Sequence, residues 1–200
     1  MFTNLLRIFY PIGLYFAIFK KLKKIKILKT LLLNLATKID IFTEYTGKLL
    51  SWLVLSLVLL VGYDVSMRYL FQSGSIGLQE MEWHLFSILF LIGAAYTLKH
   101  DDHVRMDILY RSGFLTDKHR AWMDVIGTLL ILIPFCVLII VSAWPFVSQA
   151  YLYNEGSPDP GGLPARWFIK TMIPVGFGLL VFQGIAELIK KVFAAMNSKP

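Results

Sequence analysis

The fold class is decided by one stretch, residues 122–146, which reads WMDVIGTLLILIPFCVLIIVSAWPF. Beyond Asp124 it has no charged residue. An α-helix needs about 20 apolar residues to cross roughly 30 Å of hydrocarbon, and this stretch is long enough. Apolar stretches of similar character occupy residues 48–69, 83–98 and 167–189, the second of which looks short. The sequence therefore predicts an all-α integral membrane protein with four transmembrane helices.

The composition agrees with a membrane protein. Hydrophobic residues make up 56% of the chain and charged residues 16%, whereas soluble domains average about 45–50% and about 25%. We expect a transmembrane domain over residues 41–192, a basic segment before it at residues 1–40, and a short cytoplasmic tail at residues 193–200.

The N-terminal segment is expected to be an amphipathic helix lying at the membrane surface. An apolar run at residues 8–19 precedes a cluster of lysines, which is the reverse of the charge order in a secretory signal. The lysines alternate with apolar residues such as Ile25 and Leu28, so a helix here would present one side to acyl chains and ammonium groups to anionic headgroups. A fifth span is the alternative, which Pro11 and Gly13 would weaken.

The net charge of +7 follows a membrane pattern, so we expect no nucleic-acid partner. Basic residues gather before the first span, between the second and third spans, and after the fourth, whereas the other two connections are poor in them. By the positive-inside rule, both termini and the middle loop are cytoplasmic, and the loops at residues 73–80 and 148–164 face outside. Five tryptophans at or near the span ends are expected to anchor the helices at the interface; they are Trp52, Trp83, Trp122, Trp144 and Trp167.

Few residues offer catalytic or cofactor chemistry. Cys136 is the single cysteine, so neither a disulfide nor a thiol pair can form within the chain. His84 lies at the outer end of the second span and the other histidines lie in the cytoplasmic loop, so no two could clamp a haem at membrane depth. The segment from His100 to His103 lacks further ligands at zinc-site spacing. We therefore expect no enzymatic activity, no cofactor and no metal site.

Charged residues at the outer ends of the first two spans are candidates for a structural or partner contact. Asp64 and Arg68 are four residues apart on one helical face and could pair directly. Glu80 and Glu82 open the next span and could compete for Arg68. These residues either clasp spans one and two together or dock a partner; the alternative is that they are simply interfacial and hydrated.

The second outer loop is the next candidate. Residues 154–164 contain three prolines and three glycines, so neither a helix nor a strand can run through them. The loop is longer than two adjacent spans require, and long loops are often interaction sites. Its two acids, Glu155 and Asp159, are therefore candidate partner contacts.

The interiors of the spans carry no row of polar residues. Pro134 and Pro174 are expected to kink the third and fourth spans, and Gly176 and Gly178 to allow close helix packing. An inverted repeat of the kind with which secondary transporters build a substrate site is also missing. We therefore expect that this chain does not hold a transported substrate.

Several short motifs, in their order and spacing on a four-span chain, carry a family resemblance. They are Arg68-Tyr69-Leu70-Phe71, then Glu80 and Glu82, Gly93-Ala94-Ala95-Tyr96, His103-Val104-Arg105-Met106-Asp107, Leu163-Pro164, and the stretch from Ile173-Pro174 to Gln183-Gly184. Over about residues 45–190 the chain resembles the small, DctQ-type membrane subunit of tripartite ATP-independent periplasmic (TRAP) transporters.

The resemblance implies a non-catalytic scaffold subunit in Na⁺-driven symport of organic acids across the cytoplasmic (inner) membrane of bacteria or archaea. The implied partners are a large elevator-type membrane subunit, which binds Na⁺ and substrate, and a periplasmic substrate-binding protein. The outer-face positions carried over by residue are Arg68, Glu80 and Glu82, and those of the cytoplasmic turn after the second span are His103, Arg105 and Asp107. Local helix capping is an equally compatible role for them. The long basic N-terminal segment departs from the family pattern.

Two other functions stay open. A membrane-anchor subunit of an oxidoreductase complex would also be small and four-span, but histidines within the membrane would favour it and are missing. A self-contained transporter or channel would need polar pore-lining residues, and the spans offer few.

Overall fold

The computed structural model describes the backbone of residues 2–100 and 117–197, and the side chains of residues 23–100, 119, 120 and 122–196. The helices are α1 (Phe2–Leu70), α2 (Ile76–Lys99), α4 (Asp117–Gly127), α5 (Ile133–Leu152) and α6 (Trp167–Asn197), with a π-helical turn, η1 (Thr128–Leu132), between α4 and α5. No strand occurs in these described ranges. The all-α fold class is confirmed.

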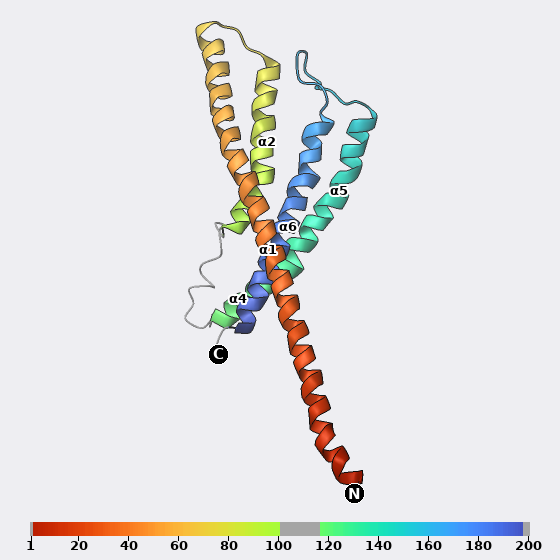
Figure 1. Cartoon of the computed structure of the whole chain (residues 1–200). Helices are drawn as coiled ribbons and strands as arrows, with labels where there is room; N and C mark the ends of the chain where they lie inside the picture. The colour runs from red at the N-terminus through yellow and green to blue at the C-terminus, as the bar shows by residue number, and fades with distance from the viewer. Residues whose placement is uncertain (1, 101–116, 198–200) are drawn as a thin grey trace.

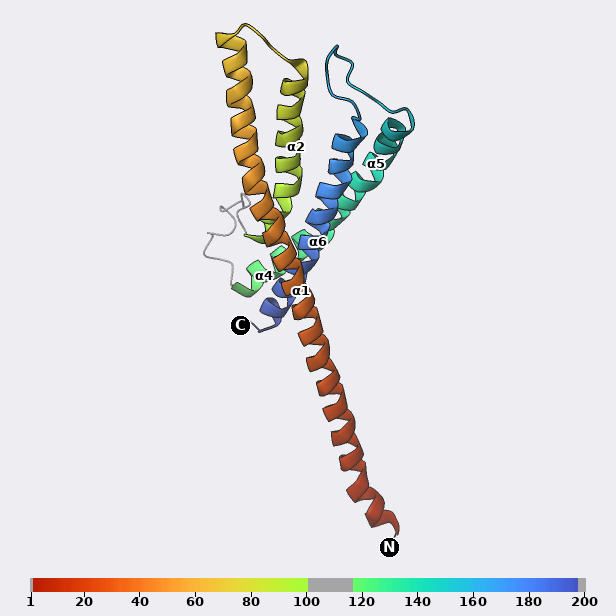
Figure 2. The same ribbon diagram turned by 45° about the horizontal axis from the view of Figure 1, so that its top comes forward.

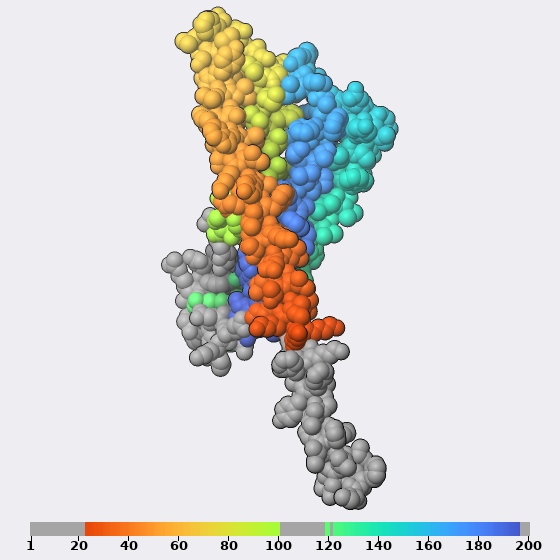
Figure 3. Space-filling view, in the orientation of Figure 1, coloured from red at the N-terminus to blue at the C-terminus, as the bar shows by residue number. Residues whose placement is uncertain are grey.

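The helices form two antiparallel pairs, α1 with α2 and α5 with α6 (Figure 1). The pairs diverge toward one end, which carries the connections at residues 71–75 and 153–166 and is called the loop end below (Figure 2). They converge at the other end, called the convergent end, where α1 lies across α6 (Figure 3). Helix α6 contacts α1, α2, α4, η1 and α5, so it is the central helix of the bundle.

Four helical stretches are long and apolar enough to cross a membrane, as the sequence predicts. They are Lys23–Leu70, Ile76–Lys99, Trp122–Leu152 and Trp167–Met196. The expectation that the second span is short was wrong. Helix α2 begins well before Trp83, directly after the extended residue Ser75, and its 24 residues are enough to span hydrocarbon.

Helix α1 continues the first span into the basic N-terminal segment without a break. Its 69 residues correspond to a rod roughly 100 Å long at about 1.5 Å per residue. It extends past the rest of the bundle at the convergent end (Figure 1). A surface position for residues 1–40, and a boundary at residue 40, stay predictions.

The helix break expected near Pro134 takes the form of the π turn η1, directly before the start of α5. Proline lacks an amide hydrogen and its ring displaces the carbonyl of the residue four positions earlier, here Leu130. A π turn lets the chain bypass that missing hydrogen bond. Pro174 lies inside α6, and Pro145, which the sequence did not single out, lies inside α5.

A glycine sets the closest approach between α2 and α6. A Cβ atom placed on Gly176 would lie 2.8 Å from both the Cβ and the carbonyl oxygen of Leu91, which is too close for any side chain. Gly178, two positions along the same helix, has no atom within 4 Å of such a Cβ. The prediction that glycines allow close packing is therefore confirmed for Gly176 but not for Gly178.

We predict that Gly176→Ala separates α2 from α6 and lowers the stability of the bundle by about 1–3 kcal/mol, the usual effect of overpacking. Gly178→Ala is the matched control and should be neutral or slightly stabilising, because alanine is favoured over glycine in a helix by up to about 1 kcal/mol. The measurement is the thermal unfolding midpoint of the purified chain in detergent. Equal midpoints for the two variants would contradict this packing.

Candidate functional site

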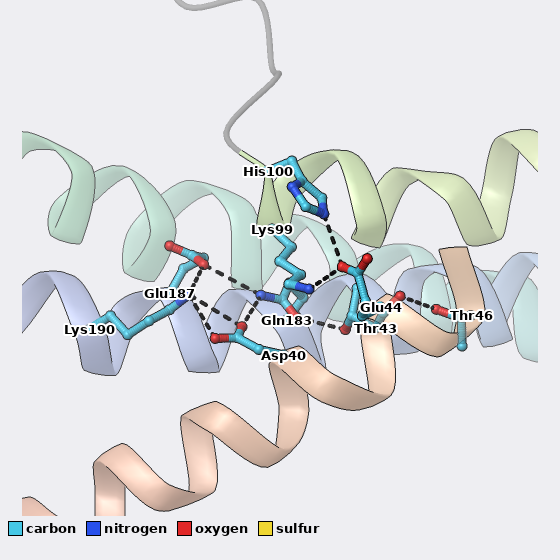
Figure 4. Close-up of polar contacts among 9 residues, drawn as sticks. All are labelled: Asp40, Thr43, Glu44, Thr46, Lys99, His100, Gln183, Glu187 and Lys190. Carbon is cyan, nitrogen blue, oxygen red and sulfur yellow. Dashed lines mark hydrogen bonds and ion pairs between the residues drawn. The ribbon is translucent and has the colours of Figure 1, made fainter. Parts of the chain in front are cut away.

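The buried polar side chains gather near the two ends of the bundle. Near the convergent end, polar residues of α1, the last turn of α2 and α6 form what we call the convergent-end network, shown in Figure 4; its members are Asp40, Thr43, Glu44, Lys99, His100, Gln183, Glu187 and Lys190. At the loop end, Glu80 of α2 holds the connection between α5 and α6 through Ser157 and Leu163, an arrangement we call the loop-end clasp.

Gln183 is the centre of the convergent-end network and is fully buried, with 0% of its surface exposed. The Thr43 hydroxyl donates to Gln183 Oε1 at 2.7 Å, and Gln183 Nε2 donates to Asp40 Oδ1 at 2.9 Å and to Glu187 Oε1 at 3.4 Å. One amide therefore uses both its donor and its acceptor groups between α1 and α6 (Figure 4). Unpaired, such a buried amide would be destabilising by about 1–3 kcal/mol.

Lys190 completes the contact between α1 and α6. Its ammonium lies 3.2 Å from both carboxylate oxygens of Asp40 and also donates to Glu187. The next residue of α6, Lys191, pairs with Asp124 of α4 at 3.3 Å. Half-buried carboxylates in an apolar bundle need such partners, because an unpaired charge in low dielectric is costly.

Glu44 ties α1 to the end of α2. Its carboxylate accepts from the Lys99 ammonium and lies 3.2 Å from Nε2 of His100 (Figure 4). The His100 ring also lies on Tyr96, with 4.4 Å between ring centroids. Because Asp40 and Glu44 are one helical turn apart, a single face of α1 meets both α6 and α2.

The sequence analysis did not predict this network, although the spacing of its polar residues along the sequence is a recognisable signal. Asp40, Thr43 and Glu44 recur at helical spacing on α1. Gln183, Glu187 and Lys190 do the same on α6. Each set is a polar stripe on an otherwise apolar helix, and buried ionisable groups in such helices are functional candidates. Only the fold shows that the two stripes face each other.

The loop-end clasp is built on Glu80, which is 5% exposed. Its Oε1 accepts from the Ser157 hydroxyl at 2.5 Å, and its Oε2 accepts from the Leu163 amide at 2.5 Å. A Cβ on Gly162 would lie 2.8 Å from Glu80 Oε2, so only glycine fits beside the carboxylate. One expectation was that Glu80 helps to clasp spans one and two together. In the structure Glu80 instead joins α2 to the loop between α5 and α6, because that loop folds over the start of α2.

The two acids of this loop behave differently. Glu155 pairs with Lys170 of α6 at 2.5 Å, and its backbone carbonyl accepts from the Arg166 amide at 2.8 Å. Asp159 has an exposed side chain and contributes backbone contacts only: its amide donates to the Ser157 hydroxyl at 3.1 Å, and its carbonyl accepts from Gly162 at 3.0 Å. Glu155 thus helps to order the loop, and Asp159 is exposed on it.

The Asp64–Arg68 ion pair that the sequence suggested is present at the end of α1. Asp64 is only 1% exposed, whereas the Arg68 side chain is partly exposed. One carboxylate oxygen of Asp64 and one of Glu82 are buried without a hydrogen-bond partner among the described residues. His103, Arg105 and Asp107 lie outside the described residues, so the cytoplasmic turn stays a prediction.

Apart from Thr43, several hydroxyl groups within the spans are bonded to their own helices. Ser56, Ser87 and Thr171 donate to the carbonyls of Trp52, Trp83 and Trp167, at 3.0, 2.7 and 2.7 Å, each four residues earlier. Among the described residues there is also no group of three or more His, Cys, Asp or Glu side chains suited to a metal ion. The polar chemistry of the described bundle therefore connects helices rather than lining a path between its ends.

We predict that Gln183→Leu lowers stability by about 1–3 kcal/mol, because it leaves the buried Thr43 and the half-buried Asp40 with fewer partners. Gln149→Leu makes the same chemical change at an exposed position of α5 and should have little effect. Thermal unfolding of both variants in the same detergent provides the measurement. A Gln183→Leu protein as stable as the control would show that the network does not hold α1 to α6.

A second prediction concerns the loop-end clasp. Glu80→Ala removes both acceptors of Ser157 and Leu163, so amide hydrogen exchange should accelerate in the loop between α5 and α6, first at the Leu163 amide. Asp159→Ala, which removes an exposed acid of the same loop, is the control and should leave exchange at Leu163 unchanged. Protection at Leu163 that survives Glu80→Ala would contradict the clasp.

Comparison with protein families identifies the chain. The family model "Tripartite ATP-independent periplasmic transporters, DctQ component" matches residues 57–194, more than half of the sequence. Comparison with curated proteins finds no match. The matched region contains the loop-end clasp and the α6 half of the convergent-end network, while Asp40, Thr43 and Glu44 precede it. On this match, the chain belongs to the family of the DctQ component, the small membrane subunit of TRAP transporters.

Proposed function

We propose that this chain is the fixed, non-catalytic small subunit of a TRAP-type secondary transporter, which supports a large elevator subunit during Na⁺-driven uptake of organic acids. Family membership supports a role in transport. The observation that carries the finer proposal is the location of the polar bonds: they join helices near both ends of the bundle, while the hydroxyls of Ser56 and Ser87 bond within their own helices. A subunit built in this way suits a scaffold better than a substrate path.

The cross-helix bonds restrict relative motion of the spans. The convergent-end network connects α1 with α2 and α6, and the Asp124–Lys191 pair connects α6 with α4. The loop-end clasp connects α2 with the loop between α5 and α6. Sliding one helix past another would break several buried bonds at once, each worth about 1–3 kcal/mol when a buried partner is left unpaired. The bundle is therefore suited to stay fixed while a partner moves.

The apolar outer surface offers an area for that partner. Leu49, Trp52 and Leu59 on α1 and Phe86 and Phe90 on α2 are well exposed in the isolated chain. In a membrane such side chains contact either lipid or another protein. We propose that one apolar face of the bundle is permanently covered by the large subunit and the remainder by lipid.

The same proposal orients the chain in the bacterial or archaeal cytoplasmic membrane. The convergent end would be cytoplasmic, since the lysines of α1 before residue 40 are concentrated there. These lysines would bind anionic headgroups on that side. The loop end would face outward, where Arg68, Glu155 and Asp159 are candidate contacts for a periplasmic substrate-binding protein.

Family membership favours the transport role over the oxidoreductase anchor. The geometry of the described histidines agrees, because His84 lies near the start of α2 and is buried, with Nδ1 2.5 Å from the Glu80 carbonyl, while His100 follows the last turn of the same helix and contacts Glu44. The two side chains thus lie at opposite ends of one helix and cannot share a haem.

Assembly is tested first. The tagged chain, purified from its native membrane in mild detergent, should bring down a much larger polytopic membrane protein. Vesicles should then accumulate an organic acid only when both chains, a periplasmic binding protein and a Na⁺ gradient are present. A chain that purifies alone, or transport that continues without it, would contradict the proposal.

A disulfide lock tests whether the bundle is fixed. A Cβ on Gly77 would lie 3.9 Å from Leu163 Cδ2, so a Gly77→Cys, Leu163→Cys pair can be joined by oxidation or a short linker. With Cys136→Ala as background, the locked transporter should work at the rate of either single-cysteine control, because α2 and the loop need not separate. Transport that stops on oxidation and returns on reduction would show instead that the loop end moves.

A further inference from the structure

A groove near the loop end has no assigned role in the scaffold proposal. It has a volume of about 410 Å³, within the roughly 300–1,000 Å³ typical of small-ligand sites. Trp83, Ser87 and Leu91 of α2 form one wall. The other wall is formed by Arg166, directly before α6, and by Ile169, Lys170 and Ile173 of α6, while Phe146 of α5 and Glu155 also line the groove. Trp83 and Phe146 are 39% and 49% exposed, so the groove opens at the surface of the bundle.

The groove changes from charged to apolar along its length. Arg166 and Trp83 lie at the loop end, whereas Leu91 and Ile173 lie farther along the helices. The eight positions from Trp83 to Leu91 correspond to a depth of about 12 Å, at about 1.5 Å per residue. Ser87, the hydroxyl residue of the wall, donates to the carbonyl of Trp83 at 2.7 Å and does not make the deeper part polar. The groove is therefore charged at its mouth and apolar in its deeper part.

Two cationic side chains lie at the mouth of the groove, and one of them is held in an ion pair within the chain. Lys170 is used by Glu155 at 2.5 Å, and its ammonium also lies 3.8 Å from the centre of the Phe146 ring. The Arg166 guanidinium lies over the face of Trp83, 5.7 Å from the ring centre. Within the described part of the chain, no acceptor is hydrogen-bonded to that guanidinium. The three ionisable side chains that line the mouth, Glu155, Arg166 and Lys170, sum to one positive charge. The Glu80 carboxylate also acts electrostatically on Arg166, but its oxygens accept from Ser157 and Leu163, so the donors of the guanidinium are left for an anion.

We propose that a membrane phospholipid occupies this groove, with its phosphate bound by Arg166 and one acyl chain lying along Leu91, Ile169 and Ile173. Arginine presents several donors in a planar fork that matches a phosphate group. A groove that opens sideways from a transmembrane bundle, beside an interfacial tryptophan, is reached from the bilayer. The lipid would lie between the side chains of α2, α5 and α6 that line the groove.

Because Trp83 lines the groove, quenching of its fluorescence can report lipid binding there. The full-length chain, purified and delipidated in detergent, is titrated with phosphatidylglycerol that carries brominated acyl chains. We expect saturable quenching with one lipid per chain, and loss of this component in Trp83→Phe. Arg166→Gln should weaken the apparent affinity by about tenfold or more, the effect of losing a charge-assisted contact. Lys48→Gln, which removes an exposed cation outside the groove, should bind like the unaltered chain.

The controls separate a phosphate site from non-specific partition. Arg166→Lys keeps the charge without the planar fork and should bind with intermediate affinity. Monodisperse elution and unchanged helical circular dichroism establish that each variant is folded. Equal affinity of Arg166→Gln and the unaltered chain would overturn the proposal, as would equal loss in Lys48→Gln. Equally tight quenching by brominated diacylglycerol, which has no phosphate, would also overturn it.

A final measurement uses the assembled transporter. In the complex with the large subunit, the saturable quenching of Trp83 should persist, because a lipid that belongs to this chain stays in its groove. Complete loss of that component on assembly would show that the groove is filled by protein, and the lipid assignment would then fall. This outcome would leave the scaffold proposal intact, so the two ideas can be judged separately.

Discussion

The bundle depends on the need to satisfy the buried amide of Gln183. An amide without surface exposure must find partners inside the protein, and it finds them in Thr43 and Asp40 of α1 and in Glu187 of its own helix. This requirement sets which face of α1 meets α6. Within a hydrocarbon solvent the hydrophobic effect gives no such direction, since lipid tails are as apolar as leucine. Hydrogen bonds and close packing are left to specify the arrangement.

Close packing supplies the second constraint. Gly176 lets α6 approach the backbone of α2 at Leu91, and the π turn before Pro134 lets the third span continue past a missing amide hydrogen. Both features lie along the central helix, because Gly176 is part of α6 and the π turn contacts α6. The two helix pairs diverge toward the loop end (Figure 2), and the groove beside Trp83 lies between side chains of α2 and α6. The loop-end clasp limits that divergence by tying the α5–α6 loop to α2.

This distribution of interactions fits the proposed role, in which a small chain serves a transporter without carrying its cargo. Polar groups such as Gln183 and Glu80 hold helices together near the two ends, and the Ser87 hydroxyl bonds to its own backbone. Many large apolar side chains are exposed on its outer surface. In the proposed function, fixed geometry rather than a solute site is what the chain would contribute.

Periodicity and charge alone determined much of this protein. Apolar length predicted four spans, and the spacing of Asp64 and Arg68 predicted their ion pair, because both properties are local to one helix. Interactions between helices were beyond such reasoning. Glu80 was expected to compete for Arg68, to dock a partner or to be hydrated at the interface, whereas it bonds to the α5–α6 loop. The stripes containing Asp40 and Gln183 were not matched to each other. Sequence spacing shows which residues share a helix face but not which face lies opposite. Only the tertiary structure decided that, since buried polar groups distant along the chain are satisfied in one particular packing of the helices.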